Sequence, residues 1–297
     1  MALPKKVRIV EVGPRDGLQN EKNPIATADK IAFIDALSQS GLRDIEVTSF
    51  VSPKAIPQLA DAVEVCAQIK RIPGITYWAL VPNEKGLDRA IEAGVDHIAV
   101  FTAASEAFNQ ANINKTIAES FEAFAPVIAR GKQHNMTIRG YVSTAFWCPY
   151  SGKADKKIVR EVSEKLLSMG VDEISIGDTI GKAIPDEVRE TVPYLLETIP
   201  VEKLAMHFHD TYGHALENIK ASLALGISIF DSSAGGLGGC PYAPGASGNV
   251  ATESVVRLMQ ELGIETGVDA EKLALASGKI REILSRVPGS VQIGGSP

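Results

Sequence analysis

The sequence predicts an α/β fold, a (β/α)8 TIM barrel with an additional C-terminal helix, and two observations support this prediction. First, a short motif recurs in which a glycine precedes a β-branched run, as expected where a helix ends and a strand begins. Second, strand-like and helix-like runs alternate along the 297 residues with no linker-like stretch between them. We therefore expect a single TIM-barrel domain over residues 1–297.

The recurring motif also predicts which side chains face the barrel lumen. Its copies are Gly41–Val47, Gly94–Val100 and Gly170–Ile176, with a shorter form at Gly226–Asp231. Aligned, the copies place isoleucines on the helix-facing side of the strands, namely Ile45, Ile98 and Ile174. Smaller or polar residues then occupy the narrower lumen side, namely Glu46, Ala99 and Ser175. Glu46 is thus expected to point inward, where a carboxylate needs a partner.

Eight strands and eight helices are expected in alternation. The strands are placed at residues 7–13, 44–49, 75–81, 96–101, 137–144, 172–177, 203–209 and 228–233. The helices are placed at 27–40, 57–70, 83–93, 114–134, 155–169, 185–197, 212–225 and 248–262. The first helix shows the basis: Thr27 suits the N-cap, Ile34 and Leu37 share one face, and Gly41 follows its end. Residues 268–286 read as a final helix outside the barrel count.

An open, doubly wound sheet is the alternative fold. It commonly carries a glycine-rich dinucleotide-binding turn after the first strand, and Gly13–Gly17 has the wrong spacing for that turn.

Composition excludes several classes of protein. The 30 basic and 36 acidic residues give a formal charge of -6 and no basic stripe, so a nucleic-acid partner is not expected. Neither a signal peptide nor a membrane-spanning run is recognisable, and we expect a cytoplasmic protein. Three cysteines without paired spacing do not suggest a disulfide framework. Cys66 and Cys148 are expected to be buried and inert.

Functional residues of a barrel gather at the C-terminal ends of its strands. The residues that this rule selects are Arg15, Asp16, Glu46, Asp178, His207, His209, Cys240 and Asn249. His207 and His209 project from the same face of a strand, although a pair of satisfied or surface histidines would show the same spacing. Joined by Asp16 and Asn249, they would offer oxygen and nitrogen ligands without thiolate, which suits Mg²⁺ or Mn²⁺ better than zinc.

Each of the other assignments has a plainer alternative. Asp16 could be an ordinary turn residue, and Asn249 an N-cap for the helix that follows it. Glu46 and Asp178 could support the site or act as acid and base, but lumen packing and loop capping would explain them equally well. Arg15 could form a surface ion pair with Asp16, or it could stabilise an oxyanion at a metal-lined mouth.

The glycine-rich loop at residues 235–249 is predicted to be a mobile lid or substrate-binding loop. Cys240 lies in this loop, where exposure and a nearby cation would favour the thiolate.

Four segments resemble the hydroxymethylglutaryl-CoA lyase family: Gly13–Asn20, Glu46–Lys54, His207–Asp210 and Gly239–Asn249. The resemblance runs over nearly the whole chain. The related isopropylmalate, homocitrate and citramalate synthases share the Arg15-Asp16 start and the histidine pair, but not the cysteine loop. The resemblance implies that Asp16, His207, His209 and Asn249 bind a divalent cation, Mg²⁺ or Mn²⁺. It also implies that Arg15 contacts the substrate carbonyl, Cys240 is the active-site thiol, and Glu46 and Asp178 are supporting acids.

The implied reaction is a retro-Claisen cleavage of 3-hydroxy-3-methylglutaryl-CoA to acetoacetate and acetyl-CoA, as in leucine degradation and ketone body metabolism. Cys240 would protonate the carbanion, directly or by relay, once its loop closes. The expected partners are an acyl-CoA substrate and a second copy of the chain in a homodimer. A mitochondrial leader and a C-terminal cysteine, common in the animal enzymes, are not found in the sequence. A Claisen-type synthase, a lyase for a related hydroxyacyl-CoA, and a barrel that binds an acyl-CoA without turnover stay open as alternatives.

Overall fold

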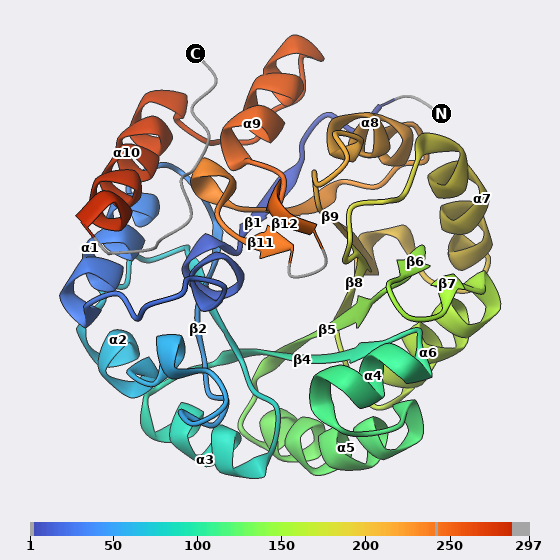
Figure 1. Cartoon of the computed structure of the whole chain (residues 1–297), viewed down its shortest axis with the longest axis horizontal. Coiled ribbons are helices and arrows are strands. Elements are labelled where there is room, and N and C mark those ends of the chain that lie inside the picture. The colour runs from blue at the N-terminus through green and yellow to red at the C-terminus, as the bar shows by residue number, and fades with distance from the viewer. Residues whose placement is uncertain (1–2, 241–242, 287–297) are drawn as a thin grey trace.

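A closed barrel of eight parallel strands, ringed by helices, forms the body of the protein (Figure 1). The computed structural model describes residues 3–240 and 243–286, with the side chains of residues 239, 240 and 243–247 left out. The strands lie in the order β1-β10-β9-β8-β5-β4-β3-β2 around the barrel. Their bounds are Arg8–Glu11 (β1), Asp44–Ser49 (β2), Thr76–Leu80 (β3), His97–Ala103 (β4), Thr137–Ser143 (β5), Glu173–Asp178 (β8), Leu204–Phe208 (β9) and Ile229–Ser232 (β10). All eight predicted strands are confirmed.

The outer layer contains the helices that the sequence predicts. They are α1 (Thr27–Ser38), α2 (Ala62–Gln68), α3 (Glu84–Glu92), α5 (Ile117–Gln133), α6 (Lys156–Ser168), α7 (Pro185–Leu196), α8 (Ala215–Ala224) and α9 (Thr252–Glu261). The final helix, α10 (Ala270–Arg286), lies beside α1 on the outside of the barrel (Figure 1). The last described helix of the chain therefore packs against the first.

One helix and two short strand pairs were not expected from the sequence. Helix α4 (Glu106–Ile113) precedes α5, and Ser105 caps it by accepting a hydrogen bond from the backbone N–H of Phe108. Two short antiparallel pairs follow the ends of barrel strands: β6 (Trp147–Cys148) with β7 (Gly152–Lys153), and β11 (Gly239–Cys240) with β12 (Ala243–Ser247). These additions all lie in segments that connect a strand to the next helix.

The predicted N-cap of the first helix was wrong by one residue. Ala26 occupies the N-cap position and Thr27 is already helical. The Thr27 hydroxyl donates a hydrogen bond of 2.8 Å to Asp61, just before α2. It therefore links α1 to α2 instead of closing the end of its own helix.

The two faces of the strands are as predicted. Ile45, Ile98 and Ile174 are fully buried and belong to the main apolar cluster between strands and helices. On the lumen side, Ala99 packs with Leu80 and Tyr141 in a separate small cluster. Glu46 and Ser175 form hydrogen bonds to other lumen residues.

Cys66 and Cys148 are buried free thiols, as expected. Burial raises the pKa of Cys66 to about 11, which keeps its thiol protonated and unreactive at neutral pH. Among the helices that the structure describes, none is both long and apolar enough to cross a membrane.

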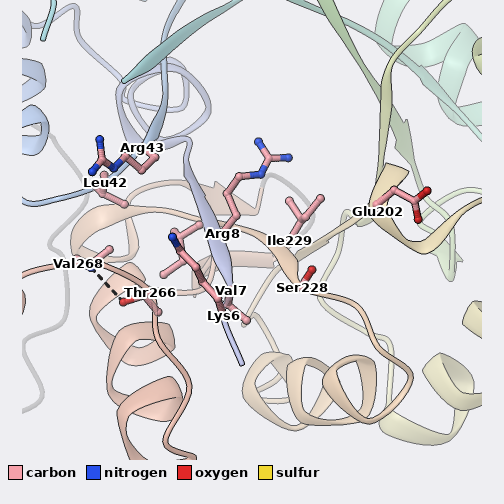
Figure 2. A pocket seen from close by; sticks show the side chains of 11 residues that line it. Lys6, Val7, Arg8, Leu42, Arg43, Glu202, Ser228, Ile229, Thr266 and Val268 are labelled. Atoms are coloured by element: carbon pink, nitrogen blue, oxygen red, sulfur yellow. Dashed lines mark hydrogen bonds between the residues drawn. The ribbon is translucent and has the colours of Figure 1, made fainter. Parts of the chain in front are cut away.

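A pocket lies at the N-terminal ends of the strands, where β1 and β10 begin (Figure 2). Its lining includes Lys6, Arg8 and Arg43 together with Glu202. The residues singled out from the sequence lie at the opposite end of the barrel. The pocket is relevant because Arg8 extends from it to carboxylates of other barrel strands.

Phe208, between the two histidines, packs away from the lumen, as its alternation with them requires. It is 1% exposed, and its ring centroid lies 6.2 Å from that of Phe146. We expect Phe208→Ala to lower the free energy of unfolding by about 3–5 kcal/mol, because it removes a fully buried ring and leaves a cavity. Urea denaturation would measure the change. Tyr212→Ala, at an exposed ring, is the matched control and should change stability by less than about 0.5 kcal/mol. A loss below about 1 kcal/mol for Phe208→Ala would contradict this packing.

Candidate metal centre

Three of the predicted metal ligands meet at the C-terminal end of the barrel. Asp16 follows β1, His207 lies in β9, and His209 comes directly after β9. One ligand atom from each of the three lies within 4.8 Å of the other two. The spacing of the two histidines and the position of a distant aspartate are therefore parts of one arrangement that could hold a metal ion.

A tight helical turn over Gly13–Gly17 holds Asp16 in place. The carbonyl oxygen of Val12 accepts hydrogen bonds from several backbone N–H groups of the turn, including that of Asp16 at 2.7 Å. A Cβ atom at Gly13 would lie 2.6 Å from Oε1 of Glu11. Only glycine fits at this point, because Glu11 Oε1 accepts a hydrogen bond of 2.8 Å from the Gly13 N–H. The turn is thus fixed at both its first residue and its middle.

Asn249 joins the same cluster from the other end of the chain. It forms an antiparallel bridge with His209, and its Nδ2 donates to Oδ2 of Asp16 at 2.9 Å and to the carbonyl of Leu237 at 3.1 Å. The alternative interpretation of Asn249 as a helix cap was wrong, because Ala251 is the N-cap of α9. Asn249 therefore lies against the predicted ligands.

Two buried atoms of this cluster have no hydrogen-bond partner among the described residues: Nδ1 of His209 and Oδ1 of Asn249. An unpaired buried polar atom costs about 1–3 kcal/mol, and a bound cation would remove that cost. The charge states fit as well. Burial would raise the pKa of Asp16, but the charges of Arg15 and of the two histidines lower it to about 2. Burial and the neighbouring His207 lower the pKa of His209 to about 3, so its imidazole is neutral and free to bind a cation.

Arg15 is a buried residue, and the interpretation as a surface ion pair was wrong. Its side chain is 8% exposed, with Nε and Nη2 each 2.7 Å from Oε2 of Glu46 and Nη1 2.6 Å from Oδ1 of Asp16. The guanidinium also lies over the ring of Tyr141, 5.4 Å from its centroid. These contacts fix a permanent positive charge next to the candidate ligands.

Glu46 points into the lumen, as predicted. It is fully buried, and its Oε2 accepts hydrogen bonds from Arg15 and from the hydroxyl of Tyr141, the latter at 3.1 Å. Burial raises the pKa of Glu46 even though Arg15 opposes the shift. Its Oε1 has no hydrogen-bond partner among the described residues, so one carboxylate oxygen is left for a further contact.

Asp178 ends β8 and caps the loop that follows it. It accepts hydrogen bonds of 3.1 Å from the backbone N–H groups of both Lys182 and Ala183. Burial raises its pKa to about 7, although these two bonds oppose the shift. The loop-capping interpretation is thus confirmed, and a role as acid or base stays a prediction that this pKa favours.

Cys240 cannot be placed to the same degree. Its backbone lies in β11, but its side chain is outside the described residues. The exposure of its thiol and the lid role of residues 235–249 remain predictions.

Sequence reasoning missed four residues that support the site: Glu11, Arg139, Tyr141 and Asp231. Asp231 lies 3.1 Å from Nδ1 of His207, and Arg139 holds Asp231. Lumen alternation along β5 would have found Arg139 and Tyr141, and Asp231 closes the shortened copy of the repeated motif. Glu11 accepts from the N–H groups of Gly13 and Ala234 and from the hydroxyl of Thr252, so it joins three segments around the site.

Comparison with known proteins places this arrangement in a family. The family model described as HMGL-like matches residues 6–280. A "3-hydroxy-3-isohexenylglutaryl-CoA/hydroxy-methylglutaryl-CoA lyase" of Pseudomonas aeruginosa is 54% identical over 98% of this chain and 97% of its own length. The human "hydroxymethylglutaryl-CoA lyase, mitochondrial" is 50% identical over 97% of this chain and 89% of its own. A crystal structure of the hydroxymethylglutaryl-CoA lyase of P. aeruginosa superimposes with a TM-score of 0.95, covering 99% and 98% of the two chains.

Burial gives Glu11 a measurable effect on stability. It raises the Glu11 pKa to about 7, despite the hydrogen bonds from Thr252, Ala234 and Gly13. Because the folded state holds this proton more tightly than the unfolded chain, the Glu11 contribution to stability is full below about pH 4.5. It is lost as the pH rises to about 7, a change of about 3 kcal/mol.

We expect Glu11→Gln to remove this dependence, since the amide keeps an acceptor for the two N–H groups and is always neutral. Urea denaturation at several pH values should show the stability of the variant gaining on wild type between about pH 4.5 and 7. Glu122→Gln, at an exposed position, should keep the wild-type profile. Parallel curves for Glu11→Gln and wild type would show that Glu11 is not the titrating group.

Proposed function

Since the chain belongs to the HMGL-like family, we propose that it is a divalent-cation-dependent carbon–carbon lyase that cleaves 3-hydroxy-3-methylglutaryl-CoA to acetoacetate and acetyl-CoA. The observation that carries the proposal is the juxtaposition of Asp16, His207 and His209 with the buried guanidinium of Arg15. Relatives about 50% identical over nearly the whole chain bear the name of this activity.

The proposed cation is Mg²⁺ or Mn²⁺, held by Asp16, His207, His209 and Asn249. The donor set is two imidazoles, a carboxylate and an amide oxygen, with no thiolate among them. When bound, the cation would supply Lewis-acid stabilisation of negative charge on substrate oxygens. The unpaired Nδ1 of His209 and Oδ1 of Asn249 support this assignment.

The residues around the proposed ligands would carry out the other steps of the cleavage. Cleavage needs the tertiary hydroxyl to lose its proton, so that the electrons of the carbon–carbon bond pass to the departing fragment, the enolate of acetyl-CoA. Arg15 is always charged and is fixed by Glu46 and Asp16, so it is suited to contact the carbonyl oxygen on which charge develops. Its burial strengthens that interaction, because little water screens it.

Proton transfer needs one acceptor and one donor. Asp178, with a pKa of about 7, and Glu46, whose pKa burial also raises, are the two candidates for the base that takes the hydroxyl proton. The thiol of Cys240 is proposed to return a proton to the carbon of the enolate when residues 235–249 close over the substrate. The carbanion then becomes the methyl group of acetyl-CoA.

Several predictions from the sequence stay predictions. They are one catalytic domain over residues 1–297, a homodimer, a cytoplasmic location, and participation in leucine degradation and ketone body metabolism. The human relative carries the word mitochondrial in its name.

A second candidate is cleavage of a related hydroxyacyl-CoA with a longer branch at the same carbon. The P. aeruginosa relative supports it, because its name includes 3-hydroxy-3-isohexenylglutaryl-CoA as a substrate. The same residues would perform the same chemistry, and only the space for the branch would differ. Comparison of kcat/KM for the two substrates decides between the candidates.

The first test is direct assay of the purified protein. With Mg²⁺ or Mn²⁺ and 3-hydroxy-3-methylglutaryl-CoA, we expect acetoacetate and acetyl-CoA in equal amounts, and no product once a chelator has removed the cation. Re-addition of the cation should restore activity. Cation-dependent binding of the substrate without product, at high protein concentration, would refute the lyase. Thiol release from acetyl-CoA with a 2-oxo acid would instead favour a synthase.

Arg15→Met provides the test of the proposed oxyanion contact. Removing the charge while keeping most of the side-chain volume should lower kcat by about 100- to 1,000-fold, the usual cost of losing one such donor. Arg130→Met is the control, because Arg130 pairs with Glu84 and Asp88 on the surface and should leave kcat unchanged. A wild-type kcat for Arg15→Met would exclude the assigned role.

A further inference from the structure

A connected set of ion pairs runs through the barrel lumen below the candidate metal centre. It begins at Asp44, which pairs with Arg8 beside the pocket of Figure 2, and it ends at His207. Its members, in order, are Asp44, Arg8, Glu173, Arg139, Asp231 and His207. The proposed mechanism uses neither Asp44 nor Arg8, and it uses none of the three residues between Arg8 and His207. Arg139 and Asp231 have no solvent exposure, and burying charges in this way is costly.

Asp231 is the member that touches the proposed ligand. It is on β10, in register with His207 on the neighbouring strand β9. One oxygen, Oδ2, lies 3.1 Å from Nδ1 of His207 and accepts a hydrogen bond of 2.8 Å from the hydroxyl of Ser175. The other, Oδ1, accepts from Nη2 of Arg139 at 2.6 Å. Both oxygens are therefore engaged, and the carboxylate has little freedom to turn.

Arg139 holds Asp231 in that orientation. Neither side chain is exposed to solvent. Each nitrogen of the guanidinium has a partner: Nη2 donates to Asp231, Nε to Glu173 at 2.8 Å, and Nη1 to the hydroxyl of Tyr141 at 3.1 Å. Burial opposes the charged form of Arg139, but the charge of Asp231 leads the contributions that hold its pKa well above the usual range. The pair is therefore ionised in the folded protein.

The lower part of the set fixes Glu173. Arg8 donates to both Glu173 and Asp44, and Asp44 also accepts a hydrogen bond of 3.0 Å from the indole of Trp78. Figure 2 shows the Arg8 side chain extending away from Lys6 and Val7. Asp44 thus lies at the end of the barrel opposite the site, and three other members of the set separate it from Asp231.

These contacts determine which nitrogen of His207 faces the metal centre. A carboxylate only accepts hydrogen bonds, so Nδ1 must carry the proton that it shares with Asp231, and Nε2 is left with its lone pair available. We propose that Asp231 is a positioning residue, which fixes the orientation and tautomer of His207 for cation binding, and that Arg139 is required to hold Asp231 in place. This inference rests on the cation site proposed above, and it adds residues that do not themselves touch cation or substrate.

A purely structural role for the lumen charges makes a different prediction, and the chain offers a matched control. Asp44 is also a buried carboxylate paired with an arginine, but it lies at the far end and contacts no proposed ligand. If these carboxylates only stabilise the barrel, Asp44→Asn and Asp231→Asn should have similar effects. If Asp231 positions His207, only Asp231→Asn should change cation binding.

The first experiment titrates Mn²⁺ alone into chelator-treated wild type, Asp231→Asn and Asp44→Asn, and follows the heat of binding, with the thermal midpoint recorded for each protein. We expect Asp231→Asn to weaken Mn²⁺ affinity by about 10- to 100-fold, the usual effect of losing the carboxylate behind a metal-binding histidine. Asp44→Asn should bind within about threefold of wild type. Equal losses in both variants, or an unchanged affinity in Asp231→Asn, would overturn the inference. Failure of wild type to bind Mn²⁺ would instead refute the cation site itself.

The second experiment needs no substitution at Asp231, so it also covers a variant that does not fold. Nitrogen-15 NMR of the Mg²⁺-loaded wild-type protein at about pH 8 reports the tautomer of each of its five histidines, with the His207 signals identified by their loss in His207→Gln. We expect the proton of His207 on Nδ1. A proton on Nε2 would show that Asp231 does not orient this ring and would overturn the inference.

Discussion

The buried ion pair between Arg139 and Asp231 is the interaction on which the candidate site depends. Both side chains are shut off from solvent in the barrel lumen, so each charge is tolerable only because the other is present. Their contact also orients the group behind His207. Removing Arg139 would leave both Asp231 and Glu173 without this shared cation inside the barrel. The lumen is therefore organised by charge pairing as much as by apolar packing.

The net charge of the ion-paired residues in the lumen also favours a bound divalent cation. Two ion-paired groups near the site together form a set of three arginines and five carboxylates, namely Arg8, Arg15, Arg139, Asp16, Asp44, Glu46, Glu173 and Asp231. With every member ionised, its formal charge is -2, which one divalent ion would neutralise. Burial raises the pKa of Glu46, and the charge of Arg15 opposes that shift. The types of ligand atom and the net charge of the set thus both favour a divalent cation at this site.

The sequence was sufficient for the fold because the repeated motif marks helix ends and strand starts locally. It was also sufficient to select Asp16, His207 and His209, since residue type and position at a strand end are local properties. It failed where a distant partner decides the outcome. Thr27 suits an N-cap by its type, yet Asp61 takes its hydroxyl. For Asn249 the residue type left a ligand role and an N-cap both open, and its contact with Asp16, near the other end of the chain, agrees with the predicted ligand cluster.

The same limit explains why the supporting residues were missed. Arg139 lies on a strand whose alternation predicts a lumen position, but nothing local indicates that its charge is matched by Asp231 from the last strand. Such pairs follow from closing the barrel, which brings β10 next to β1 and β9. Closure also lets Glu11 at the end of β1 bind Ala234 and Thr252, which flank the segment that ends in Asn249.

The proposed cation connects this arrangement of ligands to the proposed reaction. The proposed ligands offer oxygen and nitrogen donors without thiolate, a set that suits Mg²⁺ or Mn²⁺ better than zinc. A substrate that offers a hydroxyl and a carbonyl oxygen supplies two oxygen ligands. Asp16, His207, His209 and Asn249 would hold the cation, which would supply Lewis-acid stabilisation of charge on those oxygens. Asp231 contacts His207, and Glu11 holds the turn that carries Asp16, so both support residues proposed to bind the cation.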